Sequence, residues 1–296
     1  MSQQLGFCAV ILLLLSACSL PVTAPPAPPP PTVEAPLPRP VTPVPPTPTL
    51  LPATPTALPS PGSSKLPAGP LTIVALGDSL TQGDGDESGL NGYPARLQKL
   101  LETQHPGTQI LNLGKSGWTS ADLINGVNGE AATLPQALAA KPNVALLWIG
   151  SNDLWYLYEY GPEPMTAEAE QADLENYAAN LDTILSQLTS SGAAVYVALL
   201  DDQSQRPVVA NPPNPAEPAF SATTAEDLTR MSAHVNAFNE IIQQKAAQYG
   251  AVTVDFYHTD IFTNPATLYS DGNHPNTAGY EKITQLWFAA LEPEAK

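Results

Sequence analysis

The chain has 296 residues, enough for one or two domains, and 20 of its 34 prolines fall between Pro21 and Pro70. The 226 residues that follow carry 27 acidic and 9 basic side chains, whereas the first 70 carry only Glu34, Arg39 and Lys65. This acidity argues against nucleic acid or an anionic membrane surface as a partner, because both are bound through clustered lysine and arginine.

Residues 1–17 are predicted to be a lipoprotein signal peptide. The apolar run Leu5–Ala17 is too short to cross ~30 Å of hydrocarbon as a helix, and it is typical of the apolar region of a secretory signal. Segment 15–18, Leu-Ser-Ala-Cys, resembles a bacterial lipobox, although Met1–Gln4 contains no lysine or arginine. The resemblance implies cleavage before Cys18, a lipid on its thiol, and an extracytoplasmic protein tethered to the cell membrane. The alternative is an ordinary signal that is cut elsewhere.

Residues 18–70 are predicted to be a proline-rich, disordered linker. Proline has no N–H donor, so this segment cannot build helix or sheet ladders. In polyproline II conformation its roughly 50 residues would reach on the order of 100–150 Å. The composition favours a spacer that holds a single domain, residues 71–296, away from the cell envelope. Both cysteines, Cys8 and Cys18, precede this domain, which excludes a disulfide framework or a cysteine-ligated zinc site within it.

The domain alternates short apolar runs with amphipathic ones. Buried strands are predicted over Leu71–Leu76, Gln109–Leu113, Val144–Ile149, Ala194–Leu200 and Val252–Phe256. Helices are predicted over Tyr93–Gln104, Ala167–Thr189, Ala225–Gln248 and Thr277–Leu291. Strands that are apolar throughout and alternate with helices indicate a parallel sheet covered on both faces. Ligands of such sheets bind beyond the carboxyl ends of the strands.

Small polar residues follow these predicted strands. Ser79, Gly117 and Asn152 come after the first three, and Asp271 and His274 come after the last. A serine hydroxyl is a weak nucleophile that needs a base, and a carboxylate can hold the imidazole that serves as this base. The amide of Asn152 and the backbone N–H groups of Ser79 and Gly117 can donate to a developing oxyanion. The pattern therefore predicts acyl-transfer chemistry.

Four blocks in this order, each after a predicted strand, resemble the GDSL, or SGNH, hydrolase family over about residues 71–291. The resemblance implies a three-layer α/β/α sandwich with a five-stranded parallel sheet in the order 2-1-3-4-5. It implies neither a metal nor an organic cofactor. The site residues that it implies are the nucleophile Ser79, the base His274 with its partner Asp271, and the oxyanion donors Ser79, Gly117 and Asn152. The expected activity is hydrolysis of carboxylic esters through an acyl-enzyme.

Each block also has a purely structural interpretation. Ser79 is suited to cap a helix, Asn152 to form a strand-to-helix turn, and the last block to form a turn before a helix capped by Asn276. A second Asp-x-x-His pair, Asp255 and His258, also follows a predicted strand, so it competes for the role of the base.

The glycine-rich loop after Ser79 partly resembles a calcium-binding loop. Segment 84–89 matches the first half of a calcium loop, but Ala95 stands at the twelfth position, where a bidentate glutamate is required. The sequence therefore favours a solvated loop over a calcium site. Arg96 and Lys99 are expected to be solvated helix charges, and Asp78 is expected to order the serine turn.

The predicted substrate is a small-molecule or polysaccharide ester, with an acetylated carbohydrate as one candidate. The aromatic run Leu154–Tyr160 suits sugar rings and acyl chains equally, and packing in the core is the alternative. The proline-rich insertion Asp201–Ser221 is expected to shape specificity. A lysophospholipid or other lipid ester, acyl transfer to a sugar, and an inactive surface binding module remain open, and we expect a monomer.

Overall fold

The computed structural model describes residues 66–162, 164–210 and 224–292. The predicted signal peptide, Cys18 and nearly all of the predicted linker lie outside these residues and stay predictions. In the described part of the chain, no helix has both the length and the apolar character needed to span a bilayer.

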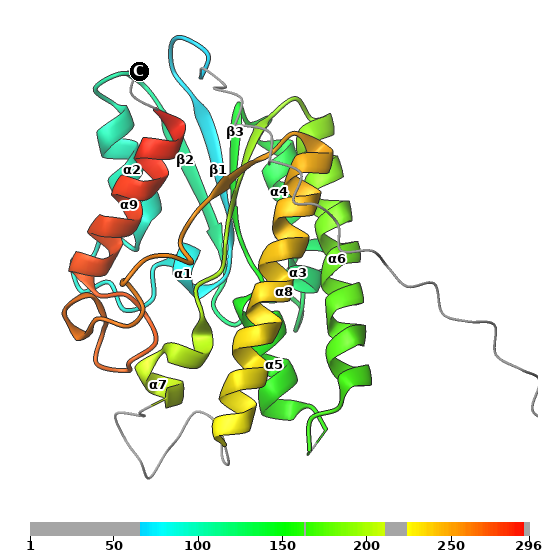
Figure 1. Ribbon diagram of the computed structural model, residues 1–296. Coiled ribbons are helices and arrows are strands. Elements are labelled where there is room, and N and C mark those ends of the chain that lie inside the picture. The colour runs from blue at the N-terminus through cyan, green and yellow to red at the C-terminus, as the bar shows by residue number, and fades with distance from the viewer. Residues whose placement is uncertain (1–65, 163, 211–223, 293–296) are drawn as a thin grey trace, which may run out of the picture. The chain divides into compact units, whose positions relative to one another are not determined.

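A five-stranded parallel sheet forms the middle layer of the domain (Figure 1). Its strands, in spatial order, are β2 (Gln109–Gly114), β1 (Thr72–Gly77), β3 (Val144–Trp148), β4 (Ala194–Ala198) and β5 (Val252–Val254). The predicted sheet and its order 2-1-3-4-5 are therefore confirmed. The central strand β3 is buried along its whole length, because helices cover both faces of the sheet.

Two layers of helices enclose the sheet (Figure 1). One face is covered by α2 (Tyr93–Leu101) and α9 (Thr277–Leu291). The other is covered by α3 (Ser120–Asn125), α4 (Thr133–Ala139), α6 (Ala167–Ser190) and α8 (Ala225–Tyr249). Beyond the carboxyl ends of the strands lie α1 (Ser79–Gln82), α5 (Ser151–Tyr160), α7 (Pro207–Ala210) and the 3-10 helix η1 (Gln203–Gln205), and a second 3-10 helix, η2 (Pro265–Thr267), precedes α9.

The long helices agree with the predicted ranges, and the short ones were not predicted. Helix α9 has the predicted bounds, whereas α2 ends at Leu101, three residues before the predicted end. Helices such as α1 and α3 span only four and six residues, so they contain too few turns to produce a periodic apolar pattern. Their ends are instead fixed by local bonds, as in α3, where Thr119 and Asp122 form a capping box.

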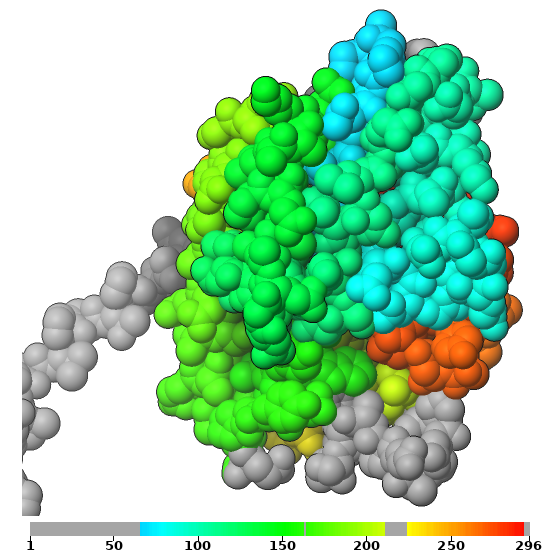
Figure 2. Space-filling view, turned by 180° about the vertical axis from the view of Figure 1, so that it is seen from behind, coloured from blue at the N-terminus to red at the C-terminus, as the bar shows by residue number. Residues whose placement is uncertain are grey.

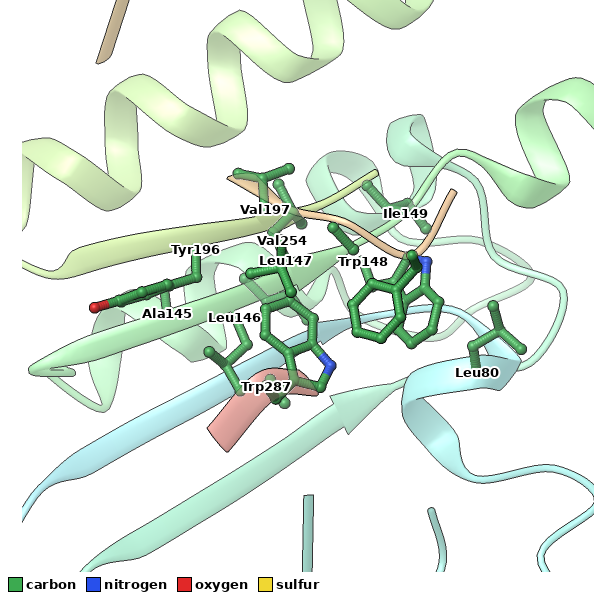
Figure 3. Packing of buried hydrophobic residues seen from close by; sticks show 14 of the residues in the cluster. Leu80, Ala145, Leu146, Leu147, Trp148, Ile149, Tyr196, Val197, Val254 and Trp287 are labelled. Carbon is green, nitrogen blue, oxygen red and sulfur yellow. The ribbon is translucent and has the colours of Figure 1, made fainter. Parts of the chain in front are cut away.

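An aromatic cluster in the core packs against the start of α1, the helix that carries Ser79. The Trp148 ring stacks on Phe256 with 4.2 Å between centroids and meets Trp287 edge-on at 6.2 Å. Figure 3 shows Trp148 between Trp287 and Leu80, and Leu80 is the second residue of α1. All four side chains are buried, and burial of each stabilises the fold by roughly 1.5–3 kcal/mol. Leu80, the residue after Ser79, is therefore packed in the hydrophobic core.

Candidate active site

Ser79 stands at the first position of α1, immediately beyond the end of β1. Asp78 caps this helix through a hydrogen bond that its carboxylate accepts from the Leu80 N–H at 3.0 Å. A Cβ at Gly77 would lie 2.3 Å from both the Thr81 hydroxyl oxygen and the Trp148 carbonyl oxygen, so the sharp strand-to-helix turn requires glycine. Asp78 thus orders the serine turn, as expected, and Ser79 itself is left half-buried at the edge of the sheet.

Asp78 is an unusual helix cap because it is fully buried. Its second carboxylate oxygen has no hydrogen-bond partner within residues 66–292 that the structure describes. Burial raises the pKa of Asp78 to about 6, although the Leu80 hydrogen bond and the nearby charge of Arg206 act in the opposite direction.

The imidazole of His274 lies between Ser79 and Asp271. Its Nε2 atom is 3.0 Å from Ser79 Oγ, and its Nδ1 atom is 2.7 Å from Asp271 Oδ2. The other oxygen of Asp271 accepts hydrogen bonds from the backbone N–H groups of Asn273 at 2.8 Å and His274 at 3.0 Å. The structure therefore brings together three side chains that span 195 positions of the sequence.

The hydrogen bonds of Asp271 define the proton arrangement in this chain of side chains. Burial alone would raise the pKa of Asp271, but the bonds from the His274 ring and the two backbone N–H groups bring this pKa below its ordinary value. An ionised carboxylate only accepts, so Nδ1 of His274 carries the proton and Nε2 directs its lone pair at the Ser79 hydroxyl. This is the arrangement in which a hydroxyl can lose its proton to a base.

The loop that carries Gly117 is tied on both sides to the neighbouring elements. On one side, the Ser116 N–H donates to Gln82 Oε1 at 2.8 Å and its hydroxyl donates to Asp84 at 2.7 Å. On the other, the Asn152 amide at the start of α5 donates to the Trp118 carbonyl at 2.9 Å. Gly117 therefore lies between the turn that follows Ser79 and the helix that begins near Asn152.

Three donors on these segments remain able to bind an oxyanion. The backbone N–H groups of Ser79 and Gly117 donate no hydrogen bond to any part of the chain that the structure describes. The Asn152 amide has a second N–H besides the one bound to Trp118. Gly117 has φ +76°, a conformation that favours glycine, and its carbonyl oxygen accepts from the Tyr156 hydroxyl at 2.8 Å.

A half-buried carboxylate, Asp153, joins the loop that carries Gly117 to α5. It accepts hydrogen bonds from the Ser120 N–H at 2.9 Å and from the Ser120 hydroxyl, which also accepts from Asn180 at 2.9 Å. Burial raises the pKa of Asp153 to about 7, although the bonds from Ser120 act to lower it. Asp153 therefore links α5, the helix that carries Asn152, to Ser120 at the start of α3. Burial makes the ionised form of Asp153 unfavourable in the folded protein.

This raised pKa predicts a measurable pH dependence of stability. The unfolded pKa is about 4 and the folded pKa about 7, so Asp153 contributes stability below pH 4 that is lost as the pH rises through 7. Asn at this position stays neutral and can still bond to Ser120. Between pH 5 and pH 8, the free energy of unfolding should therefore fall about 2–3 kcal/mol further in the wild type than in Asp153→Asn. Denaturant titrations at both pH values measure it, and equal losses in the two proteins would contradict the assignment.

The loop after α1 differs from the solvated loop that the sequence suggested. The Asp86 side chain is fully buried, and it accepts hydrogen bonds from Arg96, Ser88 and the Gly92 N–H. Burial alone would raise the pKa of Asp86, but these bonds hold it well below its usual range. The expectation that Arg96 is a solvated helix charge is wrong, because its side chain is only 8% exposed and ion-paired with Asp86.

This internal ion pair makes the loop part of the site's framework. Thr277 at the start of α9 bonds to Asp86, and the Tyr280 hydroxyl of the same helix donates to the Asp84 carbonyl at 2.8 Å. Figure 2 shows the cyan segment after β1 lying against the orange segment before α9. These contacts hold the Ser79 and His274 segments side by side.

The remaining histidines do not contact Ser79. The competing pair, Asp255 and His258, is bonded at 2.7 Å, but the His258 side chain is 76% exposed and bonds to no serine in the described part of the chain. His105 and His234 are buried, where they bond to Glu292 and Asp173 respectively. The ring that meets Ser79 is that of His274.

Arg206 and Asn273 lie near the site, although no sequence motif indicates a role for either. Arg206 follows β4 and is bonded to Asn273, which lies between Asp271 and His274. The position of Arg206 beyond a strand end was a usable signal, because the carboxyl ends of all strands converge. Its burial was not predictable, because an arginine in a proline-rich loop is usually exposed. The rest of the predicted insertion, residues 211–221, lies outside the described residues.

A serine hydrogen-bonded to a histidine and beside free backbone donors, at the carboxyl edge of a parallel α/β/α sandwich, is the arrangement typical of serine hydrolases. In agreement with this class, the GDSL-like lipase/acylhydrolase family matches residues 75–282. Because the match covers most of the sequence, the chain belongs to this family.

Curated relatives and a solved structure resemble the chain at low identity. An acetylxylan esterase of Xylanibacter ruminicola is 28% identical over 233 residues, which cover 75% of this chain and 43% of that protein. An acetylxylan esterase of Geobacillus stearothermophilus is 25% identical, covering 74% of this chain and 93% of the relative. A crystal structure of an acetylxylan esterase from the same organism superposes with a TM-score of 0.53 and 21% identity, covering 77% and 96% of the two chains. The chain thus spans less than half the length of the Xylanibacter relative.

Proposed function

We propose that this protein is a serine esterase that removes acetyl groups from carbohydrate through an acyl-enzyme. The observation that carries the proposal is the 3.0 Å contact between His274 Nε2 and Ser79 Oγ, with Nδ1 held by Asp271. This contact provides a nucleophile, a base oriented toward it and a carboxylate that stabilises the imidazolium.

In the acylation half of the reaction, Ser79 Oγ bonds to the ester carbonyl carbon while its proton passes to His274 Nε2. The carbonyl π electrons move onto the oxygen, which accepts hydrogen bonds from the N–H groups of Ser79, Gly117 and Asn152. When the tetrahedral intermediate collapses, the bond between the carbon and the alcohol oxygen breaks. The departing oxygen takes the proton from Nε2, which leaves acetyl-Ser79 and a free hydroxyl on the sugar.

Deacylation repeats these steps with water in place of serine. His274 Nε2 takes a proton from water as the water oxygen bonds to the acetyl carbon, and the same donors bind the oxyanion. Collapse breaks the bond to Ser79 Oγ, which recovers the proton from Nε2. One ester and one water are consumed, and acetic acid and the alcohol are released.

Acetylated carbohydrate is favoured as the substrate on two grounds. Two of the relatives are acetylxylan esterases. In addition, Tyr156 and Tyr160 of α5 form an exposed aromatic pair, with ring centroids 5.7 Å apart and the Tyr156 hydroxyl on the Gly117 carbonyl. Exposed aromatic faces beside an oxyanion donor are suited to stack on pyranose rings.

A panel of esters tests this function. The panel contains acetylated xylo-oligosaccharides, nitrophenyl esters of increasing acyl length and a lysophospholipid, and kcat/KM is measured for each. We expect the acetylated oligosaccharide to give the highest value and the nitrophenyl series to decline beyond acetate. A preference for long acyl chains would establish a lipid esterase instead, and transfer to added sugar alcohols would establish an acyltransferase. Absence of turnover together with absence of fluorophosphonate labelling would favour a binding module.

The role of Asn152 gives a separate prediction. Asn152→Ala removes one oxyanion donor, so kcat should fall roughly 10²–10³-fold while KM changes little, because the donor acts mainly in the transition state. Steady-state kinetics with nitrophenyl acetate provide the measurement. Asn125→Ala, on the exposed face of α3, is the matched control and should stay within about twofold of wild type. A kcat for Asn152→Ala equal to that of this control would remove Asn152 from the oxyanion hole.

A further inference from the structure

A buried arginine connects the end of β4 to the loop that carries the base. Arg206 donates two hydrogen bonds to Asp201, from Nε at 2.8 Å and from Nη2 at 2.6 Å, and its side chain is 3% exposed. Its remaining terminal nitrogen, Nη1, donates to Asn273 Oδ1 at 2.7 Å. All three nitrogens of this planar group therefore donate to side chains of the protein, and the centroid of the Phe262 ring lies 4.6 Å from its central carbon.

Asn273 transmits this arrangement to the pair of Asp271 and His274. Its side chain accepts from Arg206, while its backbone N–H donates to Asp271 Oδ1 at 2.8 Å. Asp271 in turn holds Nδ1 of the His274 ring. The path from the guanidinium to the imidazole thus passes through three consecutive hydrogen bonds.

A backbone contact fastens the same loop at the neighbouring residue. The Val208 N–H of α7 donates to the Gly272 carbonyl at 3.0 Å. The segment after β4 therefore contacts both residues that separate Asp271 from His274. Both contacts lie on the side of the loop formed by Arg206 and α7.

Stability alone does not account for this ion pair. Removing two charges from water costs about as much as their attraction returns, and apolar side chains of similar volume often replace a buried pair without loss. What such a pair provides is geometry, because the guanidinium fork fixes the direction of each of its bonds. Here the third bond of the fork is directed at the loop that holds the base.

We propose that Arg206, oriented by Asp201, is a positioning residue that holds His274 in line with Ser79 through Asn273. The inference rests on the proposed esterase function. Ser79, His274 and Asp271 are then not sufficient for full activity. His274 is aligned with Ser79 only while the hydrogen bond between Arg206 and Asn273 is intact.

Three variants isolate the contact. Asn273→Ala removes the acceptor but leaves the ion pair intact. Arg206→Lys keeps the charge beside Asp201, but an ammonium group lacks the fork needed to bond to Asp201 twice and also to Asn273. Asn273→Asp keeps a side-chain oxygen toward Arg206. Asn143→Ala is the matched control, because its Oδ1 accepts from the Thr72 N–H at 2.7 Å at the opposite end of the sheet.

Steady-state kinetics with nitrophenyl acetate distinguish positioning from general support of the fold. We expect Asn273→Ala and Arg206→Lys each to lower kcat about 10–100-fold with KM within about twofold, because displacement of a base by about 1 Å has effects of this size. A variant that combines Asn273→Ala with Arg206→Lys should be no slower than the slower of the two single variants, since each substitution removes the same contact. Asn273→Asp should recover most of the kcat, and Asn143→Ala should match wild type.

Two results would overturn the inference. One is a kcat for Asn273→Ala within about twofold of the Asn143→Ala control, and this result decides the matter even if Arg206→Lys fails to fold. The other is an Asn273→Asp variant as slow as Asn273→Ala. Ser79→Ala in the same assay keeps the two proposals separate. If it is inactive while Asn273→Ala is unaffected, only the positioning role fails, whereas an active Ser79→Ala removes the esterase mechanism itself.

Discussion

Ser79→Ala is expected to reduce kcat for nitrophenyl acetate by at least about 10⁴-fold, because it removes the atom that forms the acyl-enzyme. The remaining donors can still bind the ester and polarise it, so a small residual rate above that of water is consistent with the mechanism. The fold should be unchanged, since the variant removes only a half-buried hydroxyl that is hydrogen-bonded to the His274 ring. Turnover followed by absorbance, with circular dichroism for the fold, provides the measurement.

The control for this variant is Ser190→Ala, at the exposed carboxyl end of α6. The carboxyl end of α6 lies near the amino ends of the strands, opposite the end of the sheet where Ser79 lies (Figure 1). The kcat of Ser190→Ala should therefore stay within about twofold of wild type. A Ser79→Ala protein that turns over at the rate of this control would show that another group attacks the ester.

Asp271→Asn is expected to lower kcat about 10²–10⁴-fold, the second largest effect. An amide at this position presents either an oxygen without charge or an N–H group. The first stabilises the imidazolium less, and the second places a proton on Nε2, where the lone pair is needed. KM should change little because Asp271 contacts the base and not the ester. A fall in kcat/KM that comes from KM alone would contradict the role.

The chain itself offers a matched control for this substitution. Asp255 and His258 have the same spacing as Asp271 and His274, and the same 2.7 Å separation between carboxylate oxygen and Nδ1. Because His258 lies away from Ser79, Asp255→Asn should retain wild-type kcat within about twofold. If both variants lost activity equally, the loss would reflect removal of an Asp-x-x-His pair in general and not alignment of the base.

The layered fold was predictable because its signals are local and repeated. Apolar strands such as Val144–Trp148 alternate with long amphipathic helices, and only a parallel sheet covered on both faces accommodates that alternation. Short helices such as α1 and α3 were not predictable in this way, since four and six residues give too few turns for a pattern. Helix α5 was not predicted either, because its aromatic run, Leu154–Tyr160, has no polar face that would indicate an amphipathic helix.

The candidate site could be assembled from the sequence because each of its residues follows a strand. The carboxyl ends of parallel strands converge, so Ser79, Gly117 and Asn152 were expected at one edge of the sheet without knowledge of the side-chain contacts. The choice between the two Asp-x-x-His pairs needed coordinates. Spacing alone is identical in Asp255–His258 and Asp271–His274, and only the contact with Ser79 distinguishes them.

Buried charges were the features that the sequence did not reveal. Arg96 was expected to be solvated, yet it pairs with Asp86 inside the loop after α1, and Arg206 pairs with Asp201 beside the loop that carries His274. Arginines are mostly exposed, so burial of one requires a partner whose position depends on the tertiary fold. Asp86 precedes Arg96 by ten residues, and Asp201 precedes Arg206 by five. Neither spacing follows the period of a helix or a strand.

The activation of Ser79 by His274 is tested most directly by covalent labelling with a fluorophosphonate, followed by peptide mass spectrometry. Attack by an activated hydroxyl on the phosphorus expels fluoride and leaves a stable phosphonate ester. Our mechanism predicts a single adduct per chain, located on Ser79 and formed far more slowly in the His274→Ala variant. An adduct on another residue, or labelling of Ser79 at an unchanged rate without His274, would contradict it.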